Sequence, residues 1–157
     1  MAKSMIADAD EAFDVVQDAM IRFAGRYARR PESEWRPLFF RIVINRARDW
    51  QRRQTVRNRV MFWRRNDEMP DPVDTAPAGR GAEPDRELMD EEAMATLQTA
   101  IRELPARQQQ TFLLRCFEGL SVEETAAAMG CSGGSVKTHY FRALAALRKQ
   151  LGEHWDG

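Results

Sequence analysis

The chain has 157 residues, of which 43% are hydrophobic and 31% are charged, and its 24 Lys and Arg residues balance 24 Asp and Glu residues. This length allows one domain or two small ones with modest cores, and no apolar run is long enough to cross a bilayer. Because the N-terminus is acidic and lacks the apolar segment of a secretory signal, we expect a cytoplasmic protein.

The zero net charge conceals a strong partition along the chain. Residues 1–21 hold one Lys and five acidic residues, whereas residues 22–65 hold fourteen Arg and only three acidic residues. Ten carboxylates then face two Arg residues between positions 66 and 92. A basic block beside an acidic one indicates a surface for an anionic partner, which the net charge does not reveal.

The two cysteines carry no sign of metal or redox chemistry. Cys116 and Cys131 lie in helical patterns without a CxxC motif, and their spacing from His139 and His154 matches no usual zinc site. We therefore expect two small buried thiols, no metal site and no cofactor.

The first predicted helix runs from about residue 10 to residue 27, where apolar residues recur at steps of three and four. Asp8 or Asp10 can cap its N-terminus. We expect one apolar stripe to face the core, formed by Phe13, Val16, Met20, Phe23 and Tyr27.

A short break at residues 28–34 contains Pro31 and a possible cap at Ser33, and a second helix follows from about Trp35 to Asn58. Two faces are predicted on this helix. The apolar face holds Phe39, Val43, Ala47 and Trp50, and the basic face holds Arg41, Asn45, Arg48 and Arg52 at steps of three and four. Acidic residues that would neutralise the basic face are almost absent and tryptophans interleave with the arginines, which favours phosphate binding over a merely solvated arginine face.

The C-terminal half resumes helical spacing after an acidic segment. Residues 67–85 contain four prolines and two glycines and are typical of a flexible linker. Helical spacing then runs from Leu88 to Leu104, and Pro105 begins a further helix that ends at Gly119. No useful stretch has strand periodicity. We predict an all-α fold of two small helical domains, residues 1–65 and 88–157, joined by a linker at residues 66–87.

Residues 121–144 predict two helices joined by a tight turn. Ser121 and Glu124 form a capping box, Gly130 permits the left-handed backbone that ends a helix, and Ser132 can cap the second helix. Polar and cationic side chains on the outer face of this second helix suit the DNA major groove. These are Ser135, Thr138, His139 and Arg142, flanked by Lys137 and Phe141. A helical hairpin with an ordinary polar surface remains the alternative.

Several segments of the chain are similar to motifs of one family. L-P-A-R-Q-Q-Q-T-F-L-L-R (104–115), E-G-L-S-V-E-E-T-A (118–126) and G-C-S-G-G-S-V-K-T-H (130–139) resemble region 4 of the sigma-70 family, in particular that of the extracytoplasmic-function (ECF) sigma factors. D-V-V-Q-D (14–18) is similar to region 2.2, and E-S-E-W-R-P-L-F-F-R-I-V-I-N-R-A-R-D (32–49) resembles regions 2.3–2.4. Family members usually carry one or two helices before the region 2.2 segment. We therefore expect the first domain to lack its N-terminal helices.

The resemblance implies a transcription-initiation subunit without catalysis of its own. Implied partners are the clamp coiled coil and the flap of the large subunits of RNA polymerase core, promoter DNA and an anti-sigma factor, with no small-molecule substrate and no membrane insertion. Core binding is assigned to Asp14, Val15, Gln17 and Asp18. Recognition of the −10 element and the melted strand is assigned to Arg29, Arg30, Ser33, Trp35, Arg41, Asn45, Arg48 and Arg52. Recognition of the −35 element is assigned to Ser135, Lys137, Thr138, His139, Phe141 and Arg142.

Two other classes of function were compared with this hypothesis. A free-standing helix-turn-helix regulator would bind an operator as a dimer, but it needs neither the D-V-V-Q-D segment nor the basic helix. A nuclease using linker carboxylates such as Asp71 and Asp74 lacks a scaffold that would fix them around a metal ion. We therefore predict an ECF-type sigma factor and not an enzyme.

Overall fold

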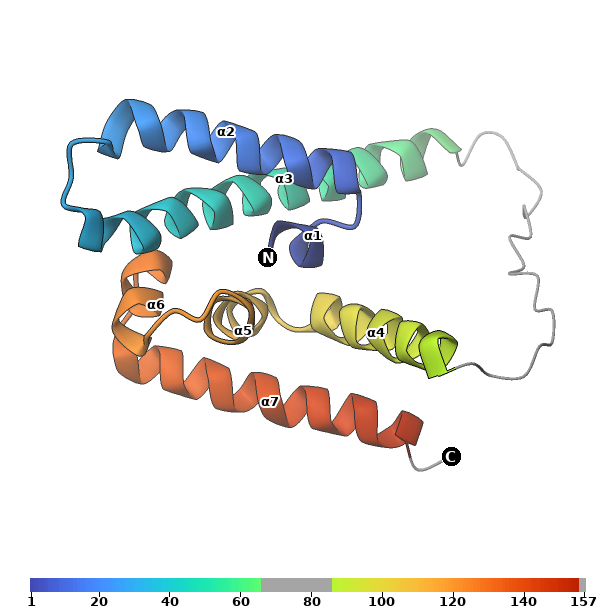
Figure 1. The fold of residues 1–157 in the computed structure, drawn as a ribbon. Helices are drawn as coiled ribbons and strands as arrows, with labels where there is room; N and C mark the ends of the chain where they lie inside the picture. The colour runs from blue at the N-terminus through green and yellow to red at the C-terminus, as the bar shows by residue number, and fades with distance from the viewer. Residues whose placement is uncertain (66–85, 156–157) are drawn as a thin grey trace.

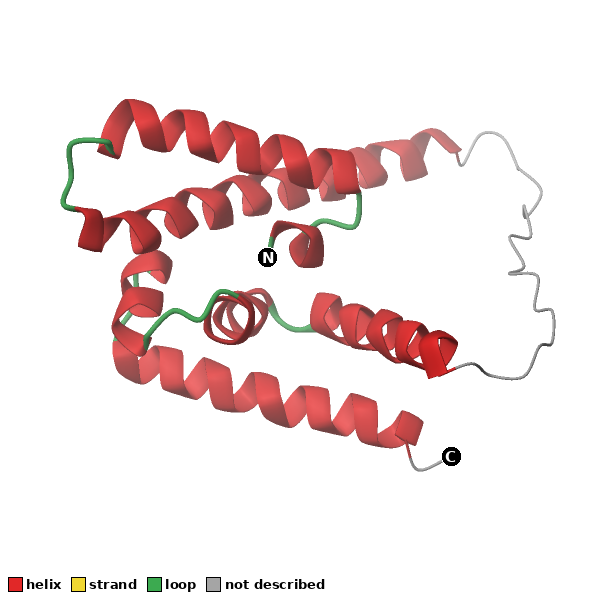
Figure 2. Cartoon of the chain, in the orientation of Figure 1, coloured by secondary structure: helices red, strands yellow, loops and turns green. Residues whose placement is uncertain are grey.

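A computed structural model describes residues 1–65 and 86–155 of the chain, and all regular structure within these ranges is helical (Figures 1 and 2). The predicted all-α fold is therefore confirmed. Most of the predicted linker lies outside the described residues. The elements are α1 (Ala2–Met5), α2 (Ala9–Tyr27), η1 (Glu32–Glu34), α3 (Trp35–Arg65), α4 (Arg86–Glu103), α5 (Ala106–Phe112), η2 (Leu113–Phe117), α6 (Val122–Met129) and α7 (Gly133–Trp155).

Helices α2 and α3 lie side by side in opposite directions (Figure 1). The side chain of Asp8 accepts hydrogen bonds from the backbone N–H groups of Asp10 and Glu11, so the predicted N-cap is confirmed. Ser33, the possible cap, lies inside η1, and Pro31, which precedes η1, makes no side-chain cap bond. An aromatic group holds the α2–α3 corner, because the ring of Phe23 meets those of Trp35 and Phe39 edge-on.

The predicted core stripe of α2 is wrong at two positions. Phe13 and Met20 are 62% and 57% exposed, and the buried residues of α2 are Ala12, Val15 and Ala19. The buried face of the helix is therefore displaced from the stripe of large side chains. Two alanines on that face allow α3 to approach closely, which a repeat of large residues would not permit.

The C-terminal half is built on α7, which contacts α4, α5 and α6. Val136, Ala143 and Leu147 form its buried face, and the helical spacing of the sequence predicts all three there. Ile101 of α4 and Leu113 of η2 are each at most 1% exposed. Gly119 follows η2 with a φ of 66°, a left-handed backbone that glycine adopts without strain, and it ends this helix as predicted.

The two helical halves pack against each other through a continuous apolar core. α1 lies between them and contacts α2, α3 and α4 (Figure 1). Ile6, which follows α1, is fully buried in a cluster with residues of both halves. That cluster also contains Ala12, Val15 and Ala47 from the first half and Ile101, Leu104, Phe112, Leu113, Ala143 and Leu147 from the second. Among the described helices, none has both the length and the apolar character required to span a bilayer.

Leu113 tests how much the core contributes to stability. Because its side chain is fully buried, Leu113→Ala leaves a cavity and should lower the free energy of unfolding by about 2–5 kcal/mol. Met94→Ala serves as the control, since Met94 is 52% exposed and its truncation should change stability by no more than about 0.5 kcal/mol. Urea unfolding followed by circular dichroism measures both, and equal losses for the two variants would contradict this core.

Candidate nucleic-acid and polymerase interfaces

Helices α6 and α7 form the predicted helix-turn-helix, and local hydrogen bonds fix its ends. The backbone N–H of Glu124 donates to Ser121 Oγ at 3.0 Å, and the backbone N–H of Ser121 donates to Glu124 Oε2 at 2.8 Å, which confirms the capping box. Gly130 ends α6 with a φ of 63°. Ser132 Oγ accepts from the backbone N–H of Ser135 at 3.1 Å, so the predicted cap of α7 is also confirmed.

The residues assigned to −35 recognition lie on the first turns of α7, and most of them lie away from its buried face. Lys137, Thr138, Phe141 and Arg142 are exposed, whereas Ser135 and His139 are half-buried. Two hydroxyls are already engaged locally: Ser135 Oγ lies 3.0 Å from Ser132 Oγ, and Thr138 Oγ1 donates to the carbonyl of Gly134. The groups most available to a partner are therefore the two cations and the ring of Phe141, which is 74% exposed.

Two side chains beside this face have shifted pKa values. Exposed Glu123 has a pKa below its usual value, chiefly because its carboxylate accepts a hydrogen bond from its own backbone N–H, and also because of Ser121 and the charge of Lys137. Tyr140 has a raised pKa, first because of its hydrogen bond with Cys116 and then because of burial. The distance between Tyr140 Oη and Cys116 Sγ is 3.3 Å. Cys116 is nevertheless exposed and Cys131 only half-buried, so the prediction of two buried thiols is wrong.

The basic face of α3 is exposed to solvent at its centre, whereas Arg41 near its start makes a hydrogen bond within the chain. Asn45 and Arg52 are exposed and Arg48 is half-buried. Arg41 reaches the other half of the molecule, where its Nη2 donates to the carbonyl of Ala127 in α6 at 2.6 Å. The structure thus places the four residues on one face, but Arg41 is already bound within the chain.

The loop before α3 presents the other residues assigned to the −10 element. Arg29, Arg30 and Ser33 are exposed. Trp35 is 37% exposed, and its Nε1 donates to the carbonyl of Arg30 at 2.8 Å, which fixes the ring at the end of the loop. Arg30 also lies 3.7 Å from the carboxylate of Glu34, a surface pair of little energetic weight.

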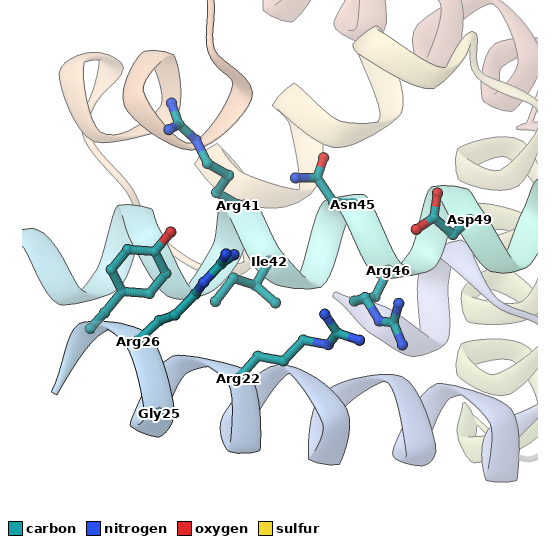
Figure 3. A pocket seen from close by; sticks show the side chains of 9 residues that line it. Arg22, Gly25, Arg26, Arg41, Ile42, Asn45, Arg46 and Asp49 are labelled. Atoms are coloured by element: carbon teal, nitrogen blue, oxygen red, sulfur yellow. The ribbon is translucent and has the colours of Figure 1, made fainter.

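A groove between α2 and α3 gathers further arginines that sequence reasoning did not assign. Its volume is about 610 Å³. Figure 3 shows the guanidinium groups of Arg22, Arg26 and Arg46 between the two helices, while Arg41 points toward α6. The spacing of Arg22 and Arg26 placed them on one side of α2, but only the packing of α2 on α3 shows that this side meets Arg46. The lining is completed by Gly25, Tyr27, Arg41, Ile42, Asn45 and Asp49.

The four residues assigned to core binding do not form one exposed set. Asp14 and Gln17 are exposed, but Val15 is 8% exposed and belongs to the core. Asp18 links α2 to α3 through its ion pair with Arg46, and its Oδ2 also accepts from Arg22 Nε, one turn further along α2, at 3.0 Å. The exposed face of α2 instead continues through apolar side chains that we had placed in the core or left unassigned, namely Phe13, Met20 and Ile21.

The nuclease alternative depends on carboxylates that surround a metal ion. Within them, no group of three or more His, Cys, Asp or Glu side chains is arranged to hold a metal ion. Asp71 and Asp74, the carboxylates considered for a nuclease, lie outside the described ranges.

Comparisons with known proteins match both halves of the chain. Residues 94–147 match the family model described as "Sigma-70, region 4". The RNA polymerase sigma-E factor of Streptomyces antibioticus is 30% identical over 148 residues, which cover 94% of this chain and 74% of that protein. The ECF RNA polymerase sigma factor SigX of Bacillus subtilis is 28% identical over 155 residues, covering 94% and 74% of the two chains.

The fold has a counterpart among solved structures. The sigma factor RpoE of Bartonella quintana, crystallised in complex with the anti-sigma factor NepR, aligns with a TM-score of 0.58 and 23% identity over 96% of this chain and 87% of that one. A free-standing helix-turn-helix regulator would not account for relatives that match α2 and α3 as well as the C-terminal half. The chain therefore belongs to the ECF group of the sigma-70 family of RNA polymerase sigma factors, non-enzymatic polymerase subunits that direct transcription initiation.

Proposed function

We propose that this sigma factor divides its task among three surfaces: α7 reads the −35 element, α3 with the adjoining groove holds the −10 element and melted strand, and the exposed face of α2 docks on core polymerase. The observation that carries the proposal is the arrangement of α7, where a buried face of Val136 and Ala143 directs Lys137 and Arg142 outward. A helix presented in this way can enter the major groove with its N-terminal turns.

The −35 contact relies on groups that are free to bind. Lys137 and Arg142 make no ion pair with any described residue, and Lys137 interacts with Glu123 only through the charge that lowers the pKa of that carboxyl group. An arginine can donate two parallel hydrogen bonds to a guanine edge, and a lysine can contact a base or a phosphate. Phe141 adds an apolar surface that suits a thymine methyl group.

The −10 contact combines the arginine face of α3 with the α2–α3 groove. Single-stranded DNA exposes phosphates and base faces, which arginines and aromatic rings bind together. Arg52 and Asn45 lie on the open side of α3, and Arg26 extends the positive surface onto α2. Extruding a base from the stack costs a few kcal/mol, and contacts to the separated strand offset that cost.

Core binding is assigned to α2 because its outer face combines carboxylate, amide and apolar groups. Asp14 and Gln17 are exposed beside Ile21, which is 72% exposed. An exposed apolar patch of this kind, bordered by polar residues, is typical of a protein interface. Asp18 has a different role in this proposal, since its ion pair with Arg46 holds α2 on α3 and so positions the face.

The remaining partners follow from the family. We propose that the α4–α7 half contacts the flap of core polymerase, that the clamp coiled coil receives α2, and that an anti-sigma factor holds the chain when it is inactive. The solved complex of the Bartonella quintana sigma factor with NepR supports the last point. The proposed site of action is the cytoplasm.

Run-off transcription with purified core polymerase tests the proposed function directly. The chain should direct core polymerase to discrete start sites on a library of candidate promoters, and core polymerase alone should not. Failure to associate with core, together with dimeric binding to duplex DNA, would instead support a free-standing regulator.

The α7 face makes a prediction about duplex binding. Lys137→Ala and Arg142→Ala should each weaken binding to a −35 duplex by about 1–3 kcal/mol, because each removes a cationic contact. Lys149→Ala is the control, since Lys149 is exposed on the same helix but lies beyond its first turns. Fluorescence anisotropy measures all three, and DNA already opened at −10 should still be bound. An equal loss for Lys149→Ala would refute a specific role for the face.

Substitutions of Asp14 and Asp18, both on α2, should have different effects on core binding and on stability. Asp14→Ala should weaken binding to core polymerase, measured by interferometry, and leave thermal stability unchanged, because Asp14 is exposed and makes no ion pair within the described residues. Asp18→Ala should also lower the melting temperature, because it leaves Arg22 and Arg46 without their shared carboxylate. If Asp14→Ala bound core as tightly as the unmodified chain, the docking face would lie elsewhere.

A further inference from the structure

The C-terminal end of α3 carries an apolar surface that the other described elements leave exposed. In Figure 1, α3 continues past the start of α2. Val56, Val60 and Met61 are 61%, 51% and 52% exposed on these last turns. They line a groove of about 550 Å³ together with Arg52, Arg53 and Arg57. An apolar patch with a polar border is typical of a site that binds another molecule.

This surface, which we call the α3 end, continues the side of α3 on which α2 packs. Arg53 lines both its groove and a second groove that lies between α2 and α3. Arg53, Arg57 and Val60 follow each other at steps of four and three residues, which keeps them on one side of a helix. Because α2 begins at Ala9 and packs on the preceding turns of α3, a helix bound at the α3 end would extend the layer that α2 forms.

The charge of the α3 end selects the kind of partner. Residues 50–65 contain six Arg and no Asp or Glu, and no described residue forms an ion pair with Arg53 or Arg57. A DNA backbone would meet the arginines but would offer nothing apolar to Val56 and Val60. The α3 end of a second copy would place arginines against arginines, and like charges in contact are costly. The partner surface is therefore apolar with acidic side chains around it.

The outer face of α2 has this chemistry. Phe13, Met20 and Ile21 are 62%, 57% and 72% exposed. Asp10 and Asp14 are exposed on the same helix, and neither makes an ion pair with a described residue. All five side chains lie away from the buried residues of α2. One α2 can therefore contact the α3 end of another copy while it remains packed on its own α3.

We propose that two copies of the chain form a dimer in which the outer face of α2 of each copy lies on the α3 end of the other. Each copy contributes both surfaces, so a two-fold axis repeats the contact and doubles the apolar area that one contact buries. The arginines of each α3 end then face carboxylates, which favours this register over the pairing of identical surfaces.

The dimer has a consequence for core binding that rests on the proposed function. The face of α2 assigned to core polymerase lies inside the dimer. A chain cannot use this face for both partners at once, so dimerisation and core binding compete. The apparent affinity for core therefore falls in proportion to the fraction of chains that are monomeric.

Two charge-reversal variants of the full chain test the contact. Arg57→Glu/Val60→Glu makes the α3 end acidic, and Asp10→Lys/Gln17→Lys makes the outer face of α2 basic; all four positions are exposed. Each variant alone brings like charges together and should be monomeric throughout a dilution series measured by sedimentation velocity. An equimolar mixture should dimerise again, because one contact is then native and the other pairs the new acids with the new lysines.

The control changes the same charges on another surface. Ala145→Glu/Lys149→Glu introduces two carboxylates and removes one cation at exposed positions of α7, and it should dimerise like the unmodified chain. Melting curves show whether each variant is folded. An unmodified chain that stays monomeric at every concentration would overturn the inference. So would a dimer that persists in both charge-reversal variants, is lost equally in the control, or is not restored in the mixture.

Binding to core polymerase separates the dimer from the proposed function. At a concentration where the unmodified chain is mostly dimeric, Arg57→Glu/Val60→Glu should bind core more tightly, by about the inverse of the monomeric fraction. A monomeric chain in which this variant weakens core binding would instead assign the α3 end to the polymerase interface and overturn the dimer. If the chain dimerises as described but directs no run-off transcription, the dimer stands and the proposed function fails. Run-off activity by a chain that never dimerises would have the opposite meaning.

Discussion

The apolar core shared by the two halves is the constraint on which the rest of the structure depends. The first half alone offers two long helices and a short one that meet through small residues such as Ala12, Ala19 and Ala47. A body of that size buries a small fraction of its surface and is marginally stable by itself. Packing on α4–α7 completes its burial. The same packing determines which charged side chains face solvent and which make hydrogen bonds or ion pairs within the chain.

The acidic and basic residues are separated along the chain, so different surfaces of the fold carry different charges. The acidic start of the chain folds onto the arginine-rich α3, and Asp18 links the two helices through Arg46. Glu11 and Asp14 of α2, which make no ion pair among the described residues, line a groove between α2 and α3 beside Arg53. Arginines left over on α3 have no acidic partner among the described residues, which suits a phosphate backbone. A net charge of zero is therefore compatible with an extended nucleic-acid surface.

Local chemistry made some of this structure predictable. The capping box at Ser121, the left-handed Gly130 and the outward side of α7 depend on residues within a turn or two of each other, and the sequence contains all of them. The core face of α2 was not predictable in the same way, because Phe13 and Met20 match a helical repeat as well as Ala12 and Ala19 do. The choice between these faces is made by the partner helix. The buried position of Val15 has the same cause.

Long-range contacts account for what sequence reasoning missed. Neither the groove beside Arg26 nor the hydrogen bond from Arg41 to Ala127 has a signal in local spacing. The proposed function requires that the two halves, which share a core in this structure, separate when α3 and α7 contact two promoter elements at once. Energy transfer between fluorophores at Ala24 of α2 and Ala145 of α7, both exposed and labelled after replacement of the native cysteines, measures this most directly. The account predicts high transfer in the free chain and low transfer in an initiation complex with core polymerase and promoter DNA. High transfer in a complex that is active in transcription would contradict it.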